Sequence, residues 1–221
     1  MNNQILSQDE IDALLRGADA AEEDVAFLTP LETNALEEIY SISFGNASTT
    51  LSAILNKKVL LAAPKIELTG LDELKSRFIA PIVAVEVAFQ QDIAGNNLLI
   101  LQVPDALTIA DLMLGQEIAT DRDELNEVEL STLGDIVYQL LNSSSSAMAA
   151  LLDKKFDMGH PQIKLMNLAK EELPSFLSTE KLVKTTFRFI IEGAIDSELF
   201  LLSSLTFARQ LSGAMLVQNQ A

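Results

Sequence analysis

The side chains that could bind or activate another molecule gather on one face of a helix predicted over residues 30–57. Residues three, four and seven apart lie on the same side of an α-helix. One such stripe holds only small or polar residues: Asn34, Glu38, Ser41, Gly45, Ser48 and Ser52. A polar stripe is also typical of the solvated face of a surface helix. These residue types alone therefore do not establish a site.

A second predicted helix, beginning near residue 126, carries a matching stripe. Its members are Ser131, Asp135, Tyr138, Asn142, Ser145 and Ala149. Apolar residues predict the buried face of the first helix: Leu31, Ala35, Leu36, Ile39, Ile42, Ala47, Leu51 and Ile54.

The composition excludes several kinds of chemistry. The chain has no cysteine and one histidine, His160, so thiol nucleophiles and histidine–cysteine metal sites are not expected. No Gly-rich phosphate loop is present. We therefore expect neither a metal nor a cofactor, and we expect His160 to be a surface or loop residue.

The charge of the chain limits its partners and its location. With 32 acidic against 15 basic residues, the net charge is −17, which disfavours nucleic acid. No apolar run approaches the roughly 18 residues of a membrane span, and the first residues do not form a signal peptide. We expect a cytoplasmic protein whose partners are other proteins.

The first 28 residues are predicted to be a short helix on a linker. Ser7 and Glu10 have the spacing of a capping box, and Leu6 with Ile11 could form a hydrophobic staple. The small and acidic segment 17–28 resembles a flexible linker. The apolar face of the helix either docks into a groove of a partner or packs on its own domain, and the residues alone favour neither.

The folded part is predicted to begin at Thr29, an N-cap followed by Pro30, with Glu32 completing a capping box. Short β-type runs follow at 59–61, 65–68, 82–89 and 98–103, with a hairpin turn expected at 94–97. A short helix over 106–114 is expected to end at Gly115.

The second half of the chain repeats the first. Shifting the sequence by 97 residues aligns 31–68 with 128–165 without a gap, and eleven of the 38 pairs are identical. These pairs include Glu32 with Glu129 and Pro64 with Pro161, and Asn126 with Glu129 repeats the predicted capping box of Thr29 and Glu32. The duplication predicts an α+β fold in which halves of about 29–117 and 126–217 share one mixed sheet covered by long helices, forming a single pseudo-two-fold domain over 29–217.

Two segments resemble known proteins of bacterial chemotaxis. The first is almost identical to the N-terminal CheY-binding peptide of FliM- and FliY-type switch proteins. In this chain that peptide lies within 1–16 and comprises Leu6, Ser7, Gln8, Asp9, Glu10, Ile11, Asp12, Leu14 and Leu15, with Ala13 between. The second, residues 35–52, resembles the signature helix of the CheC/FliY-type family of CheY-phosphate phosphatases, and the resemblance extends over nearly all of 28–217.

The resemblance implies a mechanism for the polar stripes. Members of this family dephosphorylate the aspartyl phosphate of CheY by placing the helix beside the active site of the receiver. An Asn amide orients the attacking water, and a Glu three residues earlier pairs with a receiver lysine. A Pro after the Asn completes the family's site pattern, and its place in this chain is taken by Pro64 at the first site and Pro161 at the second. The receiver supplies its own magnesium, so positioning accounts for most of the catalysis.

The chain departs from this pattern at both sites. Glu38 is kept at the first site, but Ser41 stands in place of the catalytic Asn. At the second site Asp135 replaces Glu and Tyr138 replaces Asn. A hydroxyl offers one rotatable group on a shorter arm, whereas an amide holds a donor and an acceptor in one plane. We therefore expect binding to survive better than catalysis, with the second site inactive.

The sequence thus predicts a chemotaxis or flagellar switch protein that binds phosphorylated CheY through its N-terminal helix. One alternative is an active CheY-phosphate phosphatase, and another is a structural component of the switch that contacts other switch proteins at the cytoplasmic face of the motor. Switch proteins of this type normally continue into a small all-β ring domain. No such segment follows residue 217, so permanent rotor assembly is expected to need that domain from another chain.

Overall fold

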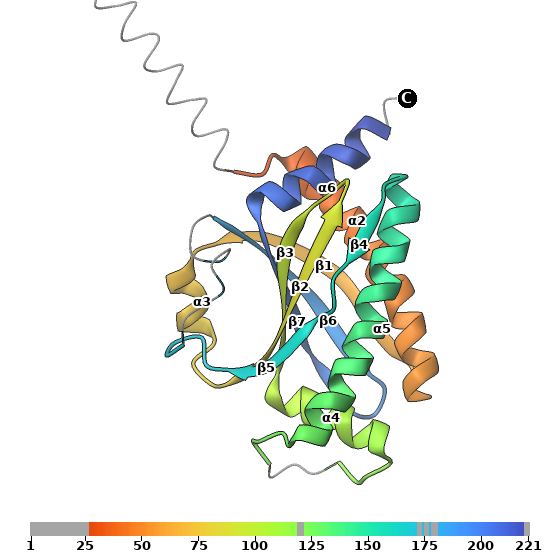
Figure 1. Cartoon of the computed structure of the whole chain (residues 1–221), viewed down its shortest axis with the longest axis vertical. Coiled ribbons are helices and arrows are strands. Elements are labelled where there is room, and N and C mark those ends of the chain that lie inside the picture. The colour runs from red at the N-terminus through yellow and green to blue at the C-terminus, as the bar shows by residue number, and fades with distance from the viewer. Residues whose placement is uncertain (1–26, 119–121, 172–173, 175–176, 178–180, 219–221) are drawn as a thin grey trace, which may run out of the picture.

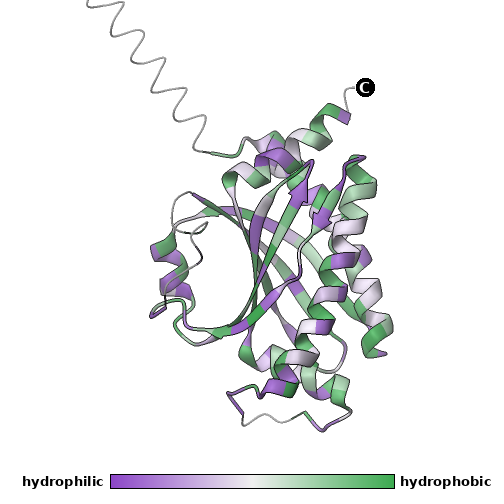
Figure 2. Cartoon of the chain, in the orientation of Figure 1, coloured by the Kyte–Doolittle hydropathy of each residue, from purple (hydrophilic) through white to green (hydrophobic). Residues whose placement is uncertain are grey.

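The computed structural model describes residues 27–118, 122–171, 174, 177 and 181–218. The predicted peptide over 1–16 and most of the predicted linker lie outside these residues. Two long helices, α2 (Pro30–Leu55) and α5 (Glu127–Leu152), pack side by side against one face of a sheet (Figure 1). In Figure 2 both helices alternate between apolar and polar residues along their length, as expected for helices with one buried side.

Each long helix begins and ends with the same local chemistry. The Thr29 hydroxyl accepts from the Glu32 N–H at 3.2 Å, and the Glu32 carboxylate accepts from the Thr29 N–H at 2.8 Å. Asn126 and Glu129 form the equivalent pair at 3.0 and 2.8 Å. Both helices end at a residue in the left-handed region, Asn56 or Asp153. The two predicted capping boxes are therefore present.

The seven strands form one sheet in the order β1-β6-β7-β3-β2-β4, and β5 also pairs with β2. Their bounds are β1 Val59–Thr69, β2 Ile82–Gln91, β3 Gly95–Gln102, β4 Phe156–Met158, β5 Gln162–Met166, β6 Leu182–Ile191 and β7 Ile195–Ser204. The α+β class and the single sheet are as predicted. The sheet is antiparallel rather than mixed, because tight hairpins join β2 to β3 and β6 to β7 and every other described pair is also antiparallel.

Two local predictions about strands need correction. The turn of the first hairpin lies at 92–94 rather than 94–97, because Asn96 and Asn97 already pair with Ala88 and Val87 in the ladder. The runs 59–61 and 65–68 belong to one strand, β1, which is interrupted by a register shift between Ala62 and Lys65. That irregularity is a β-bulge at the edge of the sheet.

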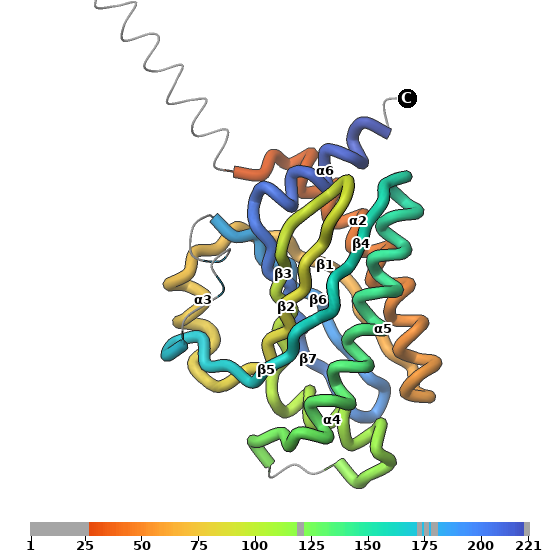
Figure 3. The backbone as a smooth tube through the Cα atoms, viewed as in Figure 1, coloured from red at the N-terminus to blue at the C-terminus, as the bar shows by residue number. Residues whose placement is uncertain are grey.

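The two halves exchange elements with each other. β1 of the first half pairs with β6 of the second, and β4 and β5 of the second half pair with β2 of the first. The closing helices follow the same rule. α4 (Val103–Leu114) packs on α5, and α6 (Leu205–Gln218) packs on α2, at opposite ends of the helical layer (Figures 1 and 3). Each half therefore completes the other.

Apolar residues are buried on both faces of the sheet. The larger core lies between the sheet and the layer of α2, α5, α4 and α6, and includes Ile39, Phe44 and Phe187. A smaller core on the other face includes Leu74 of α3 (Leu71–Arg77), Phe78 and Phe200. Among the described residues, this core covers one end of the second face, and a hollow lies at the other end beside β1.

An arginine joins the two halves at the start of α5. Arg122 donates to Glu129 at 2.5 Å and to Asp111 of α4 at 2.6 Å, and both carboxylates are almost fully buried. In the other half Arg209 of α6 lies 3.6 Å from Glu32, the equivalent capping residue. A cation thus neutralises the capping glutamate of each long helix.

We predict that Arg122→Ala lowers the melting temperature by about 5–10 °C, because the substitution leaves Asp111 and Glu129 buried without their shared counter-charge. Thermal unfolding followed by circular dichroism measures the change. Arg188→Ala is the matched control, since Arg188 and Asp196 form an ion pair that is mostly exposed. Equal melting temperatures for the two variants would contradict the prediction.

Candidate functional site

Glu38 and Ser41 lie on the exposed side of α2, together with Asn34. This half of the predicted polar stripe is therefore accessible to a partner. The predicted apolar face needs correction at two positions beside it. Leu31 is 60% exposed and Ile42 is 39% exposed, because Tyr40 and Phe44 fill the core in their place. The accessible surface near Glu38 thus carries two apolar side chains as well as polar ones.

Aromatic packing behind α2 holds this turn of the helix in place. Phe44 stacks on Phe187 of β6 with ring centroids 4.3 Å apart, and Tyr40 meets both rings edge-on at 6.1 Å. Burial raises the pKa of Tyr40 far above its usual range, and the nearby Ser203 hydroxyl counters this only in part. Tyr40 therefore stays neutral and acts as an anchor directly before Ser41.

The other half of the stripe is not solvated. Ser48 is buried and Ser52 is partly buried, and both hydroxyls face β1. The Ser48 Oγ accepts from the Leu61 N–H at 2.8 Å, and the Ser52 Oγ accepts from the Val59 N–H at 2.9 Å. This contact was not predicted, because serine is polar by type. The sequence does contain an indication of a structural role here, since Ser48 is one of the residues that the duplication repeats.

These two bonds show how β1 runs back along α2, and they place Pro64 relative to the site. Two strand residues span about 6.6 Å and four helix residues about 6 Å, so the two bonds fit a strand antiparallel to the helix. From Leu61 to Pro64 the strand advances three more residues, about 10 Å. This distance equals the rise of between six and seven helix residues, counted back from Ser48. Pro64 is therefore expected level with Ser41.

The backbone changes direction at this point of β1. Ala63 has a φ of 49°, in the left-handed region, and the register with β6 shifts between Ala62 and Lys65. Pro64 has no N–H to offer to a further strand. The bulge therefore bends the edge strand directly after the bond of the Leu61 N–H to Ser48.

The second site shows the same juxtaposition through a direct contact. The ring of Tyr138 on α5 lies against His160, with centroids 5.9 Å apart, and His160 precedes Pro161. The exposed side chain of Asp135 lies one turn away on the same helix. Gly134 is close to Ile163 of β5. By the duplication, this contact supports the placement of Ser41 beside Pro64.

The two sites differ in the room that they leave for another molecule. Tyr138 is 37% exposed, and it is a larger side chain than Ser41 at the equivalent position of the first site. His160 is a surface residue, as predicted. Among the described residues no group of three or more His, Asp or Glu side chains could hold a metal ion. At the first site, Glu38 and Ser41 can act on a partner through charge and hydrogen bonding.

A run of serines fits α5 closely against α2. Ser144 and Ser145 are buried, and the Ser143 hydroxyl lies 2.9 Å from the Thr50 hydroxyl of α2. Small size at these positions lets the two helices approach each other.

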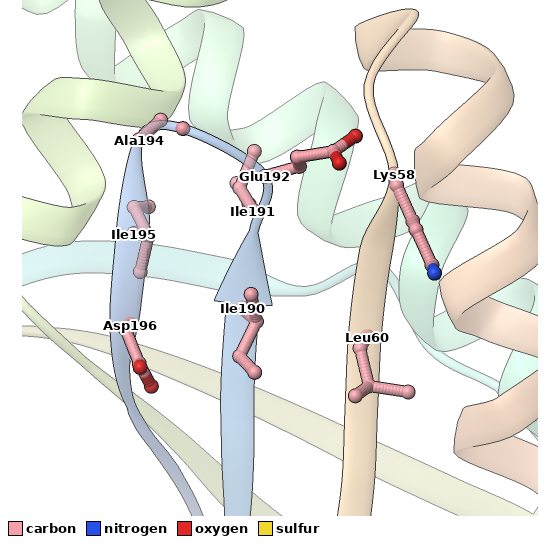
Figure 4. A pocket seen from close by; sticks show the side chains of 9 residues that line it. Lys58, Leu60, Ile190, Ile191, Glu192, Ala194, Ile195 and Asp196 are labelled. Carbon is pink, nitrogen blue, oxygen red and sulfur yellow. The ribbon is translucent and has the colours of Figure 1, made fainter.

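Two of the open hollows among the described residues bear on the site. One is formed by α2, α5 and Met113 of α4, and it is also lined by Asp135 of the second stripe. The other lies at the uncovered end of the second sheet face, where Leu60, Ile190 and Asp196 form one row across β1, β6 and β7 (Figure 4). Neither hollow contains Glu38 or Ser41.

The sequence and the fold of this chain are both similar to those of known proteins. No family model matches the chain. The chain is 34% identical, over its whole length, to the flagellar motor switch phosphatase FliY of Bacillus subtilis, of which it spans 60%. The crystal structure of Thermotoga maritima FliY superposes with a TM-score of 0.81 and 26% identity, covering 86% of this chain and 98% of that one.

In sequence and in fold the chain is similar to CheC/FliY-type proteins. Its fold is also that of FliM in the crystal structure of a FliG–FliM complex from H. pylori, with a TM-score of 0.69 at 13% identity over 84% of this chain and all of that one. None of the helices that the structure describes has the length and apolar character needed to cross a membrane.

Proposed function

We propose that this CheC/FliY-type chain is a chemotaxis or flagellar switch protein that captures phosphorylated CheY. Its N-terminal peptide, residues 1–16, makes the main contact, and residues 17–28 link it to the folded part. The observation that carries the proposal is the exposed turn of α2, which presents Glu38 and Ser41 at the surface with the buried ring of Tyr40 behind them. These are the positions that the resemblance assigns to the family's Glu and Asn, with Ser in place of the Asn.

The site supports binding better than hydrolysis. Glu38 is exposed and can pair with a lysine of the receiver. Ser41 is exposed as well, but its single hydroxyl can rotate and stands on a shorter arm than an amide. At the second site Tyr138 stands in place of the Asn, and its ring rests on His160 instead of offering an amide to a water. We infer slow turnover at the first site and none at the second.

An active CheY-phosphate phosphatase is the second candidate. Its support is the retained Glu38 and the name of the Bacillus subtilis relative, a motor switch phosphatase. In that case Ser41 itself would orient the water. The two candidates differ in a measurable rate, because a well-placed orienting group is commonly worth about 10²–10⁴-fold.

A contact with flagellar switch proteins is a further part of the proposal, and it would place the chain at the cytoplasmic face of the motor. Its support is the likeness of the fold to FliM in the FliG–FliM complex. In this role the domain of residues 29–217 would contact neighbouring switch subunits while the peptide captures CheY.

Deleting residues 1–17 tests the main contact. We expect the affinity for phosphorylated CheY to fall at least about tenfold, because Ile11, Leu14 and Leu15 would form the apolar face that a partner groove covers. Titration calorimetry measures the affinity, and the double substitution Leu14→Ser and Leu15→Ser in the full chain should reproduce the loss. The melting temperature is the control. If the deletion lowered the melting temperature substantially and left the affinity for phosphorylated CheY unchanged, the helix would pack on its own domain instead.

A further inference from the structure

β1 is the last strand on one side of the sheet, and its outer edge has no strand partner. Strand order places β6 on one side of β1 and no described strand on the other. Alternate N–H groups of such a strand, here those of Val59 and Leu61, point outward. Unpaired outward groups cost stability when buried and invite pairing with another chain when exposed. This edge therefore needs partners from elsewhere in the fold.

Two serines of α2 supply those partners. Ser48 and Ser52 accept the Leu61 and Val59 N–H groups at 2.8 and 2.9 Å. Each hydroxyl also donates to its own helix, Ser48 to the Phe44 carbonyl at 2.9 Å and Ser52 to the Ser48 carbonyl at 2.7 Å. Both the donor and the acceptor capacity of each hydroxyl are thus used. The serines are neither solvated surface residues nor simple spacers.

The paired bonds fix how far β1 can slide along α2. A strand held at one point can pivot, whereas one held at two points about 6 to 7 Å apart keeps both its distance and its register. Figure 4 shows β1 leaving the last turn of α2 at Lys58 and running back beside the helix. The strand reaches the bulge at Ala62 directly after the second bond. Together with the ladder to β6, the two hydroxyls therefore fix where the bulge of β1 lies along α2.

The other half of the chain cannot form the second of these bonds. Ser145 corresponds to Ser48, but Ala149 stands at the position of Ser52 and has no hydroxyl. There the strand breaks, because β4 ends at Met158, and the Gly159 N–H donates to the Ala88 carbonyl of β2 at 2.8 Å. The continuous strand and the doubly bonded strand thus occur in the same half, and this is the half that keeps Glu38.

We propose that Ser48 and Ser52 are positioning residues for the contact with phosphorylated CheY. By holding β1 against α2, they set Pro64 beside the turn that carries Glu38 and Ser41. This inference rests on the proposed function for its consequence in binding and turnover. The placement itself is a property of the chain alone and can be measured without CheY.

The first measurement uses the isolated full chain and compares Ser52→Ala with Ser52→Thr, which keeps the hydroxyl. Hydrogen exchange by nuclear magnetic resonance should show the Val59 amide exchanging about tenfold faster in Ser52→Ala, with the nuclear Overhauser contacts between Pro64 and the Ser41–Gly45 turn weakened. Ser52→Thr should restore both. Ser146→Ala, on the exposed side of α5, controls for the higher helix propensity of alanine.

The second measurement repeats the series in the Ser41→Asn background and follows dephosphorylation of CheY. Ser52→Ala should remove most of the rate gained by Ser41→Asn while leaving the melting temperature within a few degrees, and Ser52→Thr should return it. Unchanged Val59 exchange and Pro64 contacts in Ser52→Ala would overturn the inference. The inference would also be overturned if Ser41→Asn gave its full gain in dephosphorylation rate when combined with Ser52→Ala, although the Val59 amide exchange was altered. If Ser41→Asn itself gives no gain, the proposed site fails, and the exchange data still decide whether the serines place Pro64.

Discussion

Ser41→Asn is expected to accelerate hydrolysis of the CheY aspartyl phosphate by about 10²–10⁴-fold over the wild-type chain. The reason is geometric. Ser41 is exposed on a turn that Tyr40, Phe44 and Phe187 hold rigidly, so an amide placed there has little freedom to point elsewhere. An amide presents its donor and acceptor in one plane and can orient water toward a bound phosphoryl group. Release of phosphate from radiolabelled CheY measures the rate.

Two further variants make this result specific to the proposed site. Glu38→Ala in the Ser41→Asn background should abolish the gain, because the carboxylate that aligns the receiver is lost. Tyr138→Asn should give a smaller gain, because Asp135 is one methylene shorter than the family's Glu. Fast hydrolysis of the aspartyl phosphate by the wild-type chain would contradict the proposal of a degenerate site and would support the alternative of an active phosphatase. An unaltered rate in Ser41→Asn, with binding intact, would show that α2 does not meet CheY.

Residues 29–117 expressed alone are expected to be insoluble or molten, and the full chain is expected to unfold in one step. Without the second half, β1 loses β6, β3 loses β7, and α4 loses α5. The apolar faces of all three elements would be left in water. Thermal unfolding followed by near- and far-ultraviolet circular dichroism measures the number of transitions.

The other half, residues 126–217, should fail in the same way when expressed alone, because β6 loses β1 and α6 loses α2. Mixing the two halves should then restore a folded heterodimer. Two separate melting steps in the full chain, or a stable isolated half, would contradict the proposal of one domain over 29–217.

Local features of the fold could be predicted from the sequence because their chemistry is local. Thr29 with Glu32 and Asn126 with Glu129 need only three-residue spacing to form their caps, and both are present. Gly115 ends α4 in the left-handed conformation, as expected of glycine at this place. The duplication predicted one shared sheet because an internal repeat must bury its apolar faces against its copy.

The exchange of strands between the halves could not be predicted, because pairing of β1 with β6 joins residues far apart in the chain, such as Thr69 and Leu182. Periodicity reports which face of an element is apolar but not which strand covers it. The same limit explains why the burial of one half of the polar stripe on α2 was not predicted. Ser48 and Ser52 count as polar by type, yet a hydroxyl that has both its bonds made can be buried at little cost.

Placement of the two site copies was partly predictable. The spacing of Ser41 to Pro64 and of Tyr138 to Pro161 is the same in both halves, which indicated a helix and a returning strand. That Tyr138 rests on His160 was not foreseen, because the residue before a proline has no fixed partner in the pattern. The exposure of Ile42 was missed for a similar reason, since the large rings of Tyr40 and Phe44 take the core side of the helix.

Capture of phosphorylated CheY, as proposed, requires that the chain distinguish the phosphorylated from the unphosphorylated form. Titration calorimetry of the full wild-type chain with the two forms, at equal magnesium and ionic strength, tests it most directly. We predict affinity for the phosphorylated form at least about tenfold higher, a difference of about 1.4 kcal/mol in binding free energy. Equal affinity for the two forms, or binding to neither, would contradict the account.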